Sequence, residues 1–400
     1  MTLWAGRVGA SLAPEVWEFL RAQDDELLPY DCAATIVHAE RLAAAGLLTT
    51  DELRDVEERL AAISVDDILA SDEDVHSAIE RLLGDVGRKI HAGRSRNDQV
   101  AAALRLFVTD ACLQAGEALR SFVGALLDRA EADAETAMPG YTHLQRAIPV
   151  TLGHHLLAWV EMLERDRERF GFAREQAARS PLGAGALAGS TLPLPPPPNA
   201  LRNSIDAVAD RDFALDYLYA CSVLFVHLSR IGEELVLWTS AEFGFARLPE
   251  NAATGSSMMP QKLNPDVAEL ARGKAGTAIG RLAGLLATVK GLPLAYNRDL
   301  QEDKAPVFAA RRDVAGALEA LTVLVRGLEL DRDRLAVACA DPLLRATDAA
   351  EALVREGVPF RDAHEQVAAQ VRAGTFEPPA PRPRLGDVAT AVRASRERWS

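Results

Sequence analysis

The sequence predicts an all-α protein whose centre is a bundle of five long helices. In five segments apolar residues recur at steps of three and four, which is the period of a helix with one buried face. We expect these helices to start near Asp98, Thr151, Phe213, Asp266 and Asp303. No segment shows a competing two-residue alternation of the kind found in half-buried strands. Helices of this length are typical of bundles.

Apolar seams support each part of the bundle. The segment from Asp98 to about Asp133 carries a stripe at Val100, Leu104, Phe107, Ala111, Ala115, Leu119, Phe122, Leu126 and Ala130. Heptad steps appear at Tyr217, Cys221, Leu224, Leu228, Ile231, Leu235 and Trp238, and again at Val314, Leu318, Leu321, Val325 and Leu328. The segment from Asp266 has its stripe at Val267, Leu270, Ala271, Ala278, Leu282, Leu285 and Val289. Such spacing indicates one packed face per helix.

Shorter helical segments flank the bundle. Before it, helices are expected over Tyr30–Ala45 and Thr50–Ile63, the second capped by Thr49 or Thr50, and a third begins in the acidic run from Asp72. After it, the helical pattern continues to a break at Pro378–Pro383, and a short charged helix ends the sequence. The resulting domains are an N-terminal helical domain (1–92), a central long-helix domain (93–339) and a small C-terminal helical domain (340–400).

Composition narrows the class of partner. The 400 residues have 48% hydrophobic content, which is ordinary for a globular protein. Their net charge of −14 makes the protein acidic. That charge argues against nucleic acid or an anionic membrane as the main partner. An anionic substrate therefore needs a local positive site.

Cysteine usage and the N-terminus suggest a cytoplasmic chain. Cys32, Cys112, Cys221 and Cys339 are far apart and show no metal-ligand spacing, so we expect reduced core residues without disulfides or zinc. The first residues, Met1–Arg7, contain no long apolar run, and no signal peptide or membrane span is expected.

The stretch Thr254–Pro265 carries the clearest chemistry. It combines a mobile small-residue start around Ser256 with one ammonium, Lys262, and one amide, Asn264, at the N-terminus of a long helix. The free N–H groups and the dipole there favour negative charge. A hydroxyl beside a fixed cation and an amide suits proton abstraction next to a carboxylate. The alternative is a plain Ser/Gly loop that caps the helix.

Two further polar stretches lie at helix ends. Before the first long helix, Ser95, Arg96 and Asn97 follow a glycine and could bind an anion, or simply form a basic helix cap. Thr142 and His143 lie in a Pro/Gly-bounded turn between two long helices, which favours a site over a structural pair. His154 and His155, in the next helix, are interpreted as structural.

Together these motifs resemble the argininosuccinate lyase family of the fumarase/aspartase superfamily. The similarity covers nearly the whole chain, and its strongest blocks are 89–100, 140–147, 254–269 and 291–304. The last block, Gly-Leu-Pro-Leu-Ala-Tyr-Asn-Arg-Asp-Leu-Gln-Glu-Asp-Lys, distinguishes this family from fumarases and adenylosuccinate lyases. Four features depart from the family pattern: Leu20 where a substrate-binding serine is usual, Ile148 where glutamine is usual, the run Pro195–Pro198, and a short C-terminal domain.

The resemblance implies elimination of fumarate from argininosuccinate, leaving arginine, without a metal or an organic cofactor. It assigns Ser256 as the base, Lys262 and Asn264 as the groups that hold an aci-carboxylate intermediate, His143 as the acid and Glu269 as its orienting carboxylate. The implied substrate-binding residues are Ser95, Asn97 and Thr142 for the succinyl carboxylates, Arg96, Tyr296, Gln301 and Lys304 for the arginine part, and Asp24, which falls on an aspartate that the family retains. The resemblance also implies a homotetramer in which each active site takes its regions from three chains.

Two alternatives remain open from the residues. Leu20, Ile148 and the short C-terminus favour a relative that releases fumarate from another N-substituted aspartate. A non-catalytic structural homologue, of the crystallin kind, is the alternative from a different class, although the intact acid, base and anion-binding set argues against it.

Overall fold

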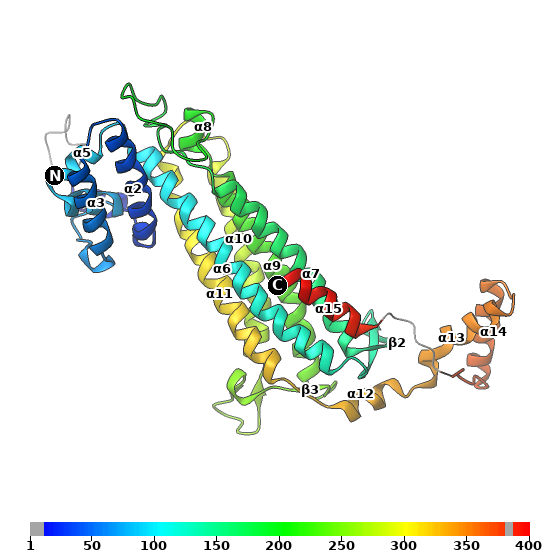
Figure 1. The fold of residues 1–400 in the computed structure, drawn as a ribbon. Coiled ribbons are helices and arrows are strands. Elements are labelled where there is room, and N and C mark those ends of the chain that lie inside the picture. The colour runs from blue at the N-terminus through cyan, green and yellow to red at the C-terminus, as the bar shows by residue number, and fades with distance from the viewer. Residues whose placement is uncertain (1–11, 381–386) are drawn as a thin grey trace. The chain divides into compact units, whose positions relative to one another are not determined.

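The computed structural model describes residues 12–380 and 387–400, and helices dominate it (Figure 1). Met1–Arg7, in which no signal peptide was expected, lie outside these described residues. So does part of the break expected at Pro378–Pro383. The chain divides into two compact units. Unit 1 comprises the described parts of Met1–Gly116, Asp166–Val223 and Gly276–Ala315, and unit 2 comprises those of Glu117–Arg165, Leu224–Ala275 and Gly316–Ser400.

The five predicted long helices are present and start within two residues of the expected positions. They are α6 (Arg96–Ala132), α7 (Leu152–Ala177), α9 (Asp212–Thr239), α10 (Asp266–Val289) and α11 (Lys304–Gly327). Each runs through both units, so each unit contains a portion of all five. The predicted stripe of α6 and the heptad seams of α9 and α11 are buried throughout, which confirms the packing prediction for these three helices.

The seam predicted for α10 is partly wrong. Ala271, Ala278 and Leu285 are buried, but the side chain of Leu270 is 61% exposed. Ile279 and Leu286 of the same helix are exposed as well, beside a row of glycines at Gly276, Gly280 and Gly284. The helix buries its small residues inside its own chain and leaves larger apolar ones uncovered, because alanine, rather than leucine, fills the narrow space facing its neighbours.

The all-α prediction also needs a correction, since the described residues contain three small antiparallel sheets. Their strands are β1 (Ala137–Thr142) with β2 (Gln145–Thr151), β3 (Ala246–Arg247) with β6 (Glu329–Leu330), and β4 (Thr254–Gly255) with β5 (Leu263–Asn264). The two-residue strands are too short to show an alternating pattern, and the burial of β1 and β2 does not alternate along the strand, which explains why the sequence did not reveal them. Both stretches with predicted catalytic residues lie on these hairpins.

The shorter helices agree with the predicted flanking segments. In unit 1 Thr49 caps α3 through a reciprocal capping box with Glu52, as the sequence suggested. The remaining α-helices are α1 (Pro14–Leu20), α2 (Leu28–Ala44), α3 (Thr50–Ala62), α4 (Val75–Leu83), α5 (Asp85–Ile90), α8 (Ser204–Ala209), α12 (Arg332–Cys339), α13 (Ala346–Arg355), α14 (Phe360–Ala373) and α15 (Val388–Trp399). Short 3₁₀ turns are η1 (Asp25–Leu27), η2 (Val65–Asp67), η3 (Glu250–Ala252), η4 (Arg298–Asp303) and η5 (Pro342–Arg345).

The prediction that the cysteines are core residues is correct for three of the four. All four cysteines are free, and three are buried while Cys339 is half-buried. Residues 192–198, which include the proline run, have no regular secondary structure, and the carbonyl of Pro195 accepts a hydrogen bond from Arg41 at 2.7 Å. No helix in the described ranges is long and apolar enough to cross a membrane.

In unit 2 the terminal helix α15 docks on α6 and α7 (Figure 1). Arg396 pairs with Asp128 at 2.7 Å, and Arg398 pairs with Glu164 at 2.9 Å. Trp399 is buried, and its indole N–H donates to Glu164 at 3.2 Å while its carbonyl accepts from Arg120 at 3.0 Å. Because the ion pairs are half-exposed, the buried indole should contribute most of the docking energy.

We expect Trp399→Ala to lower the free energy of unfolding by about 3–5 kcal/mol, since it removes a buried aromatic side chain and leaves a cavity. Urea unfolding followed by far-ultraviolet circular dichroism measures this change. The control is Val337→Ala on α12, whose side chain is 68% exposed and should change stability little. Equal effects from the two substitutions would contradict the docking role of Trp399.

Candidate active site

The predicted site residues fall into two groups, one in each compact unit. Unit 1 contains the substrate-binding residues Asp24, Ser95, Arg96, Asn97, Tyr296, Gln301 and Lys304. Unit 2 contains Thr142, His143, Ser256, Lys262, Asn264 and Glu269. The predicted binding groups, apart from Thr142, are thus separate from the predicted acid and base, and each group is described within its own unit.

The turn that begins α6 is fixed by a docked glycine-rich loop. Asp98 accepts a hydrogen bond from the backbone N–H of Ser95 at 2.9 Å, and its other oxygen accepts from Gly183 and Gly185 at 3.1 and 3.0 Å. The Asn97 amide donates to the carbonyl of Ala186 at 3.1 Å. These bonds tie the Ser95–Asn97 turn to residues 85 or more positions later in the chain. Burial raises the pKa of the Asp98 carboxyl, although these N–H donors oppose the shift.

The N-terminus of α4 links two of the predicted binding residues. Asp74 caps this helix by accepting from the N–H of Ser77 at 2.7 Å, and it pairs with the guanidinium of Arg96 at 3.4 Å. Asp24 is buried and accepts from the N–H of Val75 at 3.1 Å. Burial raises the pKa of Asp24, and His76 and Lys304 act in the opposite direction. Asp24 and Arg96 therefore approach the same helix end.

Leu20 ends α1 and is joined to the loop that precedes α11. Its carbonyl accepts from Arg298 at 2.6 Å, and the same guanidinium pairs with Glu73 at 3.1 Å. Arg298 begins η4, the turn that contains Gln301 and ends just before Lys304. The segment with the unusual leucine is thus bound directly to the segment that carries predicted binding residues.

A buried carboxylate, Asp31, connects α2, α4 and α6. The ring of His76 donates to Asp31 at 2.7 Å, and the amide of Gln99 donates to both of its oxygens at 3.1 and 2.8 Å. Burial alone raises the pKa of Asp31, but His76, Arg94 and Gln99 outweigh it and hold the pKa below its usual value. Burial lowers the pKa of His76, but Asp31 outweighs this effect and the pKa is raised. The pair is therefore a buried ion pair.

A second buried carboxylate, Asp303, holds Lys304. The Lys304 ammonium donates to Asp303 at 3.0 Å, and the guanidinium of Arg211 bonds to the other carboxylate oxygen. All three side chains are at most 4% exposed. Burial, followed by the charge of Asp303, raises the pKa of Tyr296. Among the described residues, the Gln301 carbonyl oxygen and one Arg211 nitrogen are buried without a hydrogen-bonding partner, so both could bind an incoming polar group.

In unit 2 Thr142 and His143 lie at the tip of the β1–β2 hairpin, which corrects the simple turn predicted from the sequence. Thr142 pairs with Gln145, and the two residues between them, His143 and Leu144, have φ of 54° and 56°. Two consecutive left-handed residues form the loop type that matches strand twist. Each non-glycine residue in this region costs on the order of 1–3 kcal/mol. The hairpin thus holds His143 in an unusual backbone conformation and exposes it.

Ser256 lies in the loop of the β4–β5 hairpin that leads into α10. Its Oγ accepts hydrogen bonds from the backbone N–H groups of Met258 and Met259, at 3.2 and 3.0 Å. Two donors aimed at one oxygen favour negative charge on it. Asn264 pairs with Thr254 across the hairpin, and Thr254 bonds to the carboxylate of Asp266 at the start of α10. The predicted placement of Lys262 and Asn264 before a helix N-terminus is therefore confirmed.

Glu269 occupies the first turn of α10 and lies 3.9 Å from Arg272, whose guanidinium also bonds to Glu233. His155, predicted to be structural, donates a hydrogen bond to the Glu234 carboxylate and packs against Trp159 and Trp238, in agreement with the prediction. Within the two described ranges, no group of three His, Cys, Asp or Glu side chains is arranged to hold a metal ion.

Sequence reasoning did not identify the buried groups Asp31, His76, Arg211 and Asp303. The His76 and Gln99 partners of Asp31 are 45 and 68 residues away, so no local spacing reveals the network. A local signal is that the polar residues Asp31, Thr35 and His38 recur at steps of four and three, which places them on one face of α2.

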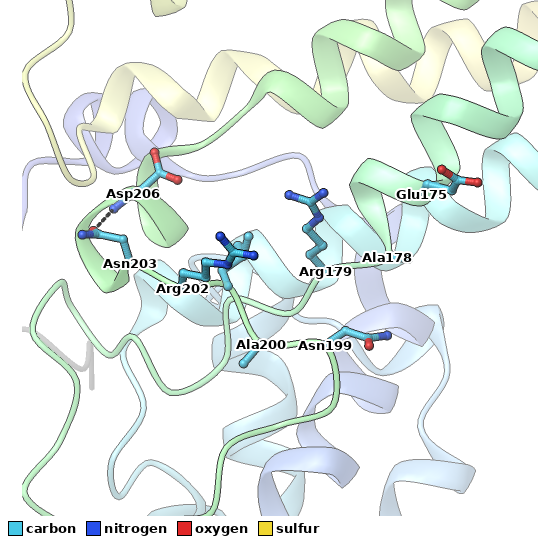
Figure 2. A pocket seen from close by; sticks show the side chains of 9 residues that line it. Glu175, Ala178, Arg179, Asn199, Ala200, Arg202, Asn203 and Asp206 are labelled. Carbon is cyan, nitrogen blue, oxygen red and sulfur yellow. Dashed lines mark hydrogen bonds between the residues drawn. The ribbon is translucent and has the colours of Figure 1, made fainter.

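A cavity of about 810 Å³ in unit 1 lies between the end of α7 and α8 (Figure 2). Arg179 and Arg202 line it, together with the acidic Glu175 and Asp206. Asn203 directs its side chain to the N–H groups of Ile205 and Asp206 and thereby caps α8. None of the predicted site residues lines this cavity, and we do not assign it to the reaction.

Comparison with known proteins identifies the family. A family model described as "Lyase" matches residues 20–280, and one described as "Argininosuccinate lyase C-terminal" matches residues 343–376. The argininosuccinate lyase of Acidothermus cellulolyticus is 50% identical over 385 residues, covering 91% of this chain and 79% of the relative. That of a Synechococcus strain is 47% identical over 395 residues, covering 94% and 81%. The chain belongs to the argininosuccinate lyase family.

Solved structures place this family member in the wider fumarase fold. The crystal structure of EDDS lyase in complex with formate has a TM-score of 0.76 at 28% identity, and the match covers 98% of this chain and 85% of that one. A class II fumarase from Schistosoma mansoni has a TM-score of 0.74 at 14% identity, covering 89% and 88%, which shows the shared fold alone. The family resemblance predicted from the sequence is confirmed.

The Asp31–His76 pair makes stability depend on pH in a defined direction. Because the pKa of His76 is raised by folding, its contribution is complete below the unfolded value of about 6.5 and is lost as pH rises through the folded value. The pKa of Asp31 is lowered, so its carboxylate stays ionised across this range. We therefore expect the difference in unfolding free energy between wild type and His76→Asn to be largest near pH 6 and to shrink at higher pH.

Urea unfolding at several pH values measures this difference. The matched control is His154→Asn, because the His154 side chain is exposed on α7 and has no ion pair among the described residues. A wild-type advantage over His76→Asn that stays constant with pH would contradict the buried ion pair.

Proposed function

We propose that this protein is an argininosuccinate lyase, which eliminates fumarate from argininosuccinate and leaves arginine, a step of arginine biosynthesis. The observation that carries this conclusion is the 50% identity to an argininosuccinate lyase across 91% of the chain, joined to the family's own C-terminal model. The non-catalytic alternative is not retained, because the chain is a carbon–nitrogen lyase by family and keeps its reactive side chains.

Ser256 is proposed as the base that removes a proton from the succinyl carbon. A free serine hydroxyl is a poor base, and its alkoxide needs stabilisation. Supporting this role, Oγ already accepts two backbone N–H groups, from Met258 and Met259, and Lys262 lies in the same hairpin loop. Lys262, Asn264 and the N-terminus of α10 then hold the aci-carboxylate that forms as the proton leaves.

His143 is proposed as the acid that protonates the leaving nitrogen, with Glu269 as its orienting carboxylate. Exposure at the hairpin tip gives the imidazole access to a substrate. Thr142, next to it on the same tip, is proposed to bind a succinyl carboxylate. The base thus takes the proton from one succinyl carbon while the acid protonates the nitrogen that leaves the adjacent carbon, so the C–H and C–N bonds break and the C=C bond of fumarate forms.

The remaining binding groups come from unit 1. Ser95 and Asn97 are proposed for the succinyl carboxylates, and Arg96, Tyr296, Gln301, Lys304 and Asp24 for the arginine part. Two features support this assignment: the unpaired carbonyl oxygen of Gln301, and the fixed position of Lys304 on Asp303. These groups recognise the substrate without a metal or an organic cofactor in the proposed reaction.

We propose a homotetramer with active sites shared between subunits. The exposed face of α10 supports it, since Gly276, Gly280 and Gly284 allow close approach of another helix and Ile279 and Leu286 offer apolar area. The tips of the two reactive hairpins also expose apolar side chains, Leu144 at 67% and Met258 at 87%. We further propose the domain boundaries 1–92, 93–339 and 340–400, and a cytoplasmic location.

A second candidate function is release of fumarate from a different N-substituted aspartate. Leu20 favours it, because a leucine side chain cannot donate a hydrogen bond to the amino-acid end of argininosuccinate. Loss of such a contact costs about 1–3 kcal/mol when a buried group is left unpaired. A coupled assay separates the two functions: fumarate from other adducts, with no arginine from argininosuccinate, would reject the first.

Ser256→Ala is the test of the proposed base. We expect kcat to fall by about 10²–10⁴-fold, the contribution typical of a positioned proton acceptor, with a smaller change in KM. Ultraviolet absorbance of fumarate follows the reaction. Ser257→Ala is the matched control, because it removes the neighbouring exposed hydroxyl and should stay active. Loss of activity in Ser257→Ala, with activity retained in Ser256→Ala, would show that the base is Ser257 and that the assignment to Ser256 is wrong.

Lys304→Gln tests the binding assignment. The substitution keeps a polar side chain, one atom shorter, but removes a charge beside the buried Asp303. We expect kcat/KM to fall by about 10–100-fold, the effect of one charge-assisted hydrogen bond. Fumarate release over a range of substrate concentrations measures it. An unchanged kcat/KM would show that Lys304 only neutralises Asp303.

A further inference from the structure

The β1–β2 hairpin carries Thr142 and His143 on a tip that has little support of its own. Residues 142–146 are all exposed, so no side chain of the tip is buried in unit 2. Leu144, Gln145 and Arg146 line a hollow of about 570 Å³. Two left-handed residues, His143 and Leu144, form the loop. Something outside the tip must therefore fix its position.

The base of the hairpin is held by packing and by close backbone approach. The first strand packs against α12, and the second packs against η5. A Cβ atom at Gly140 would lie 2.7 Å from the carbonyl oxygen of Ile148, so only glycine allows the strands to come this close. The register shifts between Pro139 and Tyr141, which changes the direction of the hairpin just before the tip.

Tyr141 is half-buried and directly precedes the exposed tip. Its ring contacts a pair of phenylalanine rings. The ring centroids of Tyr141 and Phe243 are 5.6 Å apart, and those of Tyr141 and Phe245 are 6.4 Å apart. Phe243 and Phe245 pack edge to face at 5.4 Å. Such pairs are directional, so they fix the orientation of the tyrosine ring as well as its distance.

The aromatic pair is itself anchored on backbone hydrogen bonds. The guanidinium of Arg334, in α12, donates to the carbonyls of Phe243 and Glu242, both at 3.1 Å. The N–H of Phe245 donates to Trp238 at 2.9 Å, and its carbonyl accepts from Asp331 at the same distance. These hydrogen bonds fix the backbone of the segment that carries Phe243 and Phe245.

We propose that Tyr141, through its contact with Phe243 and Phe245, is a positioning residue that sets where His143 can deliver its proton. The inference rests on the proposed function, because it gives Tyr141 a role through the proposed acid. Tyr141 precedes His143 by two residues, and a small rotation about Tyr141 displaces the exposed tip. Misplacement of a catalytic group by about 1 Å can cost about 10²-fold in rate.

The experiment compares Tyr141→Leu with Tyr141→Phe in the full-length protein. The phenylalanine variant keeps the ring contacts and removes only the hydroxyl. We expect Tyr141→Leu to lower kcat by about 10–100-fold with a smaller rise in KM, because Thr142 shares the displaced tip while the unit 1 binding groups are untouched. Tyr141→Phe should retain near wild-type kcat. Phe243→Leu, on the other side of the contact, should reproduce the effect of Tyr141→Leu and serves in its place if that variant does not fold.

A readout independent of activity separates this inference from the proposed function. In ¹⁵N-histidine-labelled protein, the His143 imidazole signal, assigned by its loss in His143→Asn, should shift or broaden in Tyr141→Leu and stay unchanged in Tyr141→Phe. Wild type that forms no fumarate from argininosuccinate would reject the proposed function, whereas the spectrum still tests the positioning.

Two results would overturn the inference. Wild-type kcat in Tyr141→Leu, together with an unchanged His143 signal, would show that the ring contact does not set the tip. Equal loss of kcat in Tyr141→Phe and Tyr141→Leu would show that the hydroxyl, rather than the ring, is responsible.

Discussion

The apolar seams of α6, α9 and α11 are closed by packing, so the residues assigned to the reaction lie near the ends of the long helices, and this constraint determines where the proposed site lies. The seams of α6, α9 and α11 are buried over their whole predicted lengths, which leaves no room for a substrate between them. The residues assigned to the reaction accordingly occupy helix starts, the hairpins that join helices, and short turns. Ser95–Asn97 begin α6, and the Ser256 hairpin leads into α10. The residues assigned to the reaction thus lie on the segments that connect the helices, while the helices hold these segments at fixed distances within the chain.

The sequence predicted the long helices better than the segments that connect them, for a physical reason. Periodicity over 20 residues or more averages out single exceptions, so the predicted starts of the five long helices came within two residues of the structure. The hairpins depend on pairing between short strands. The β1–β2 hairpin also needs left-handed backbone at His143 and Leu144, and neither position holds the glycine that would have indicated it. The prediction that Leu270 is buried was wrong because an apolar stripe identifies one face of a helix without identifying what covers that face. The Asp31 network was not predicted because its residues meet only after folding.

Buried carboxylates give unit 1 its fixed geometry. Asp31 joins α2, α4 and α6, and Asp303 holds Lys304 against Arg211. A buried ion pair often adds little net stability compared with apolar packing, yet removal of one partner is costly because the other charge is stranded. The value of these pairs is therefore positional: they leave the side chains of Gln99 and Lys304 few alternative arrangements. A binding site for a flexible substrate with several charged groups benefits from that order, since less conformational entropy is lost when the substrate binds.

The two reactive hairpins present the opposite situation, because both His143 and the loop around Ser256 face solvent in the single chain. Proton transfer from carbon and stabilisation of an aci-carboxylate are weak in water, where the dielectric screens the lysine and the helix N-terminus. The hydrogen bonds to Ser256 act fully only when water is excluded from them. Exposed apolar side chains at the tips, such as Leu144 and Met258, are poorly placed for an isolated chain and well placed for a covered one. The exposure of the proposed catalytic groups therefore supports the proposed homotetramer, in which other copies of the chain would supply the covering surface.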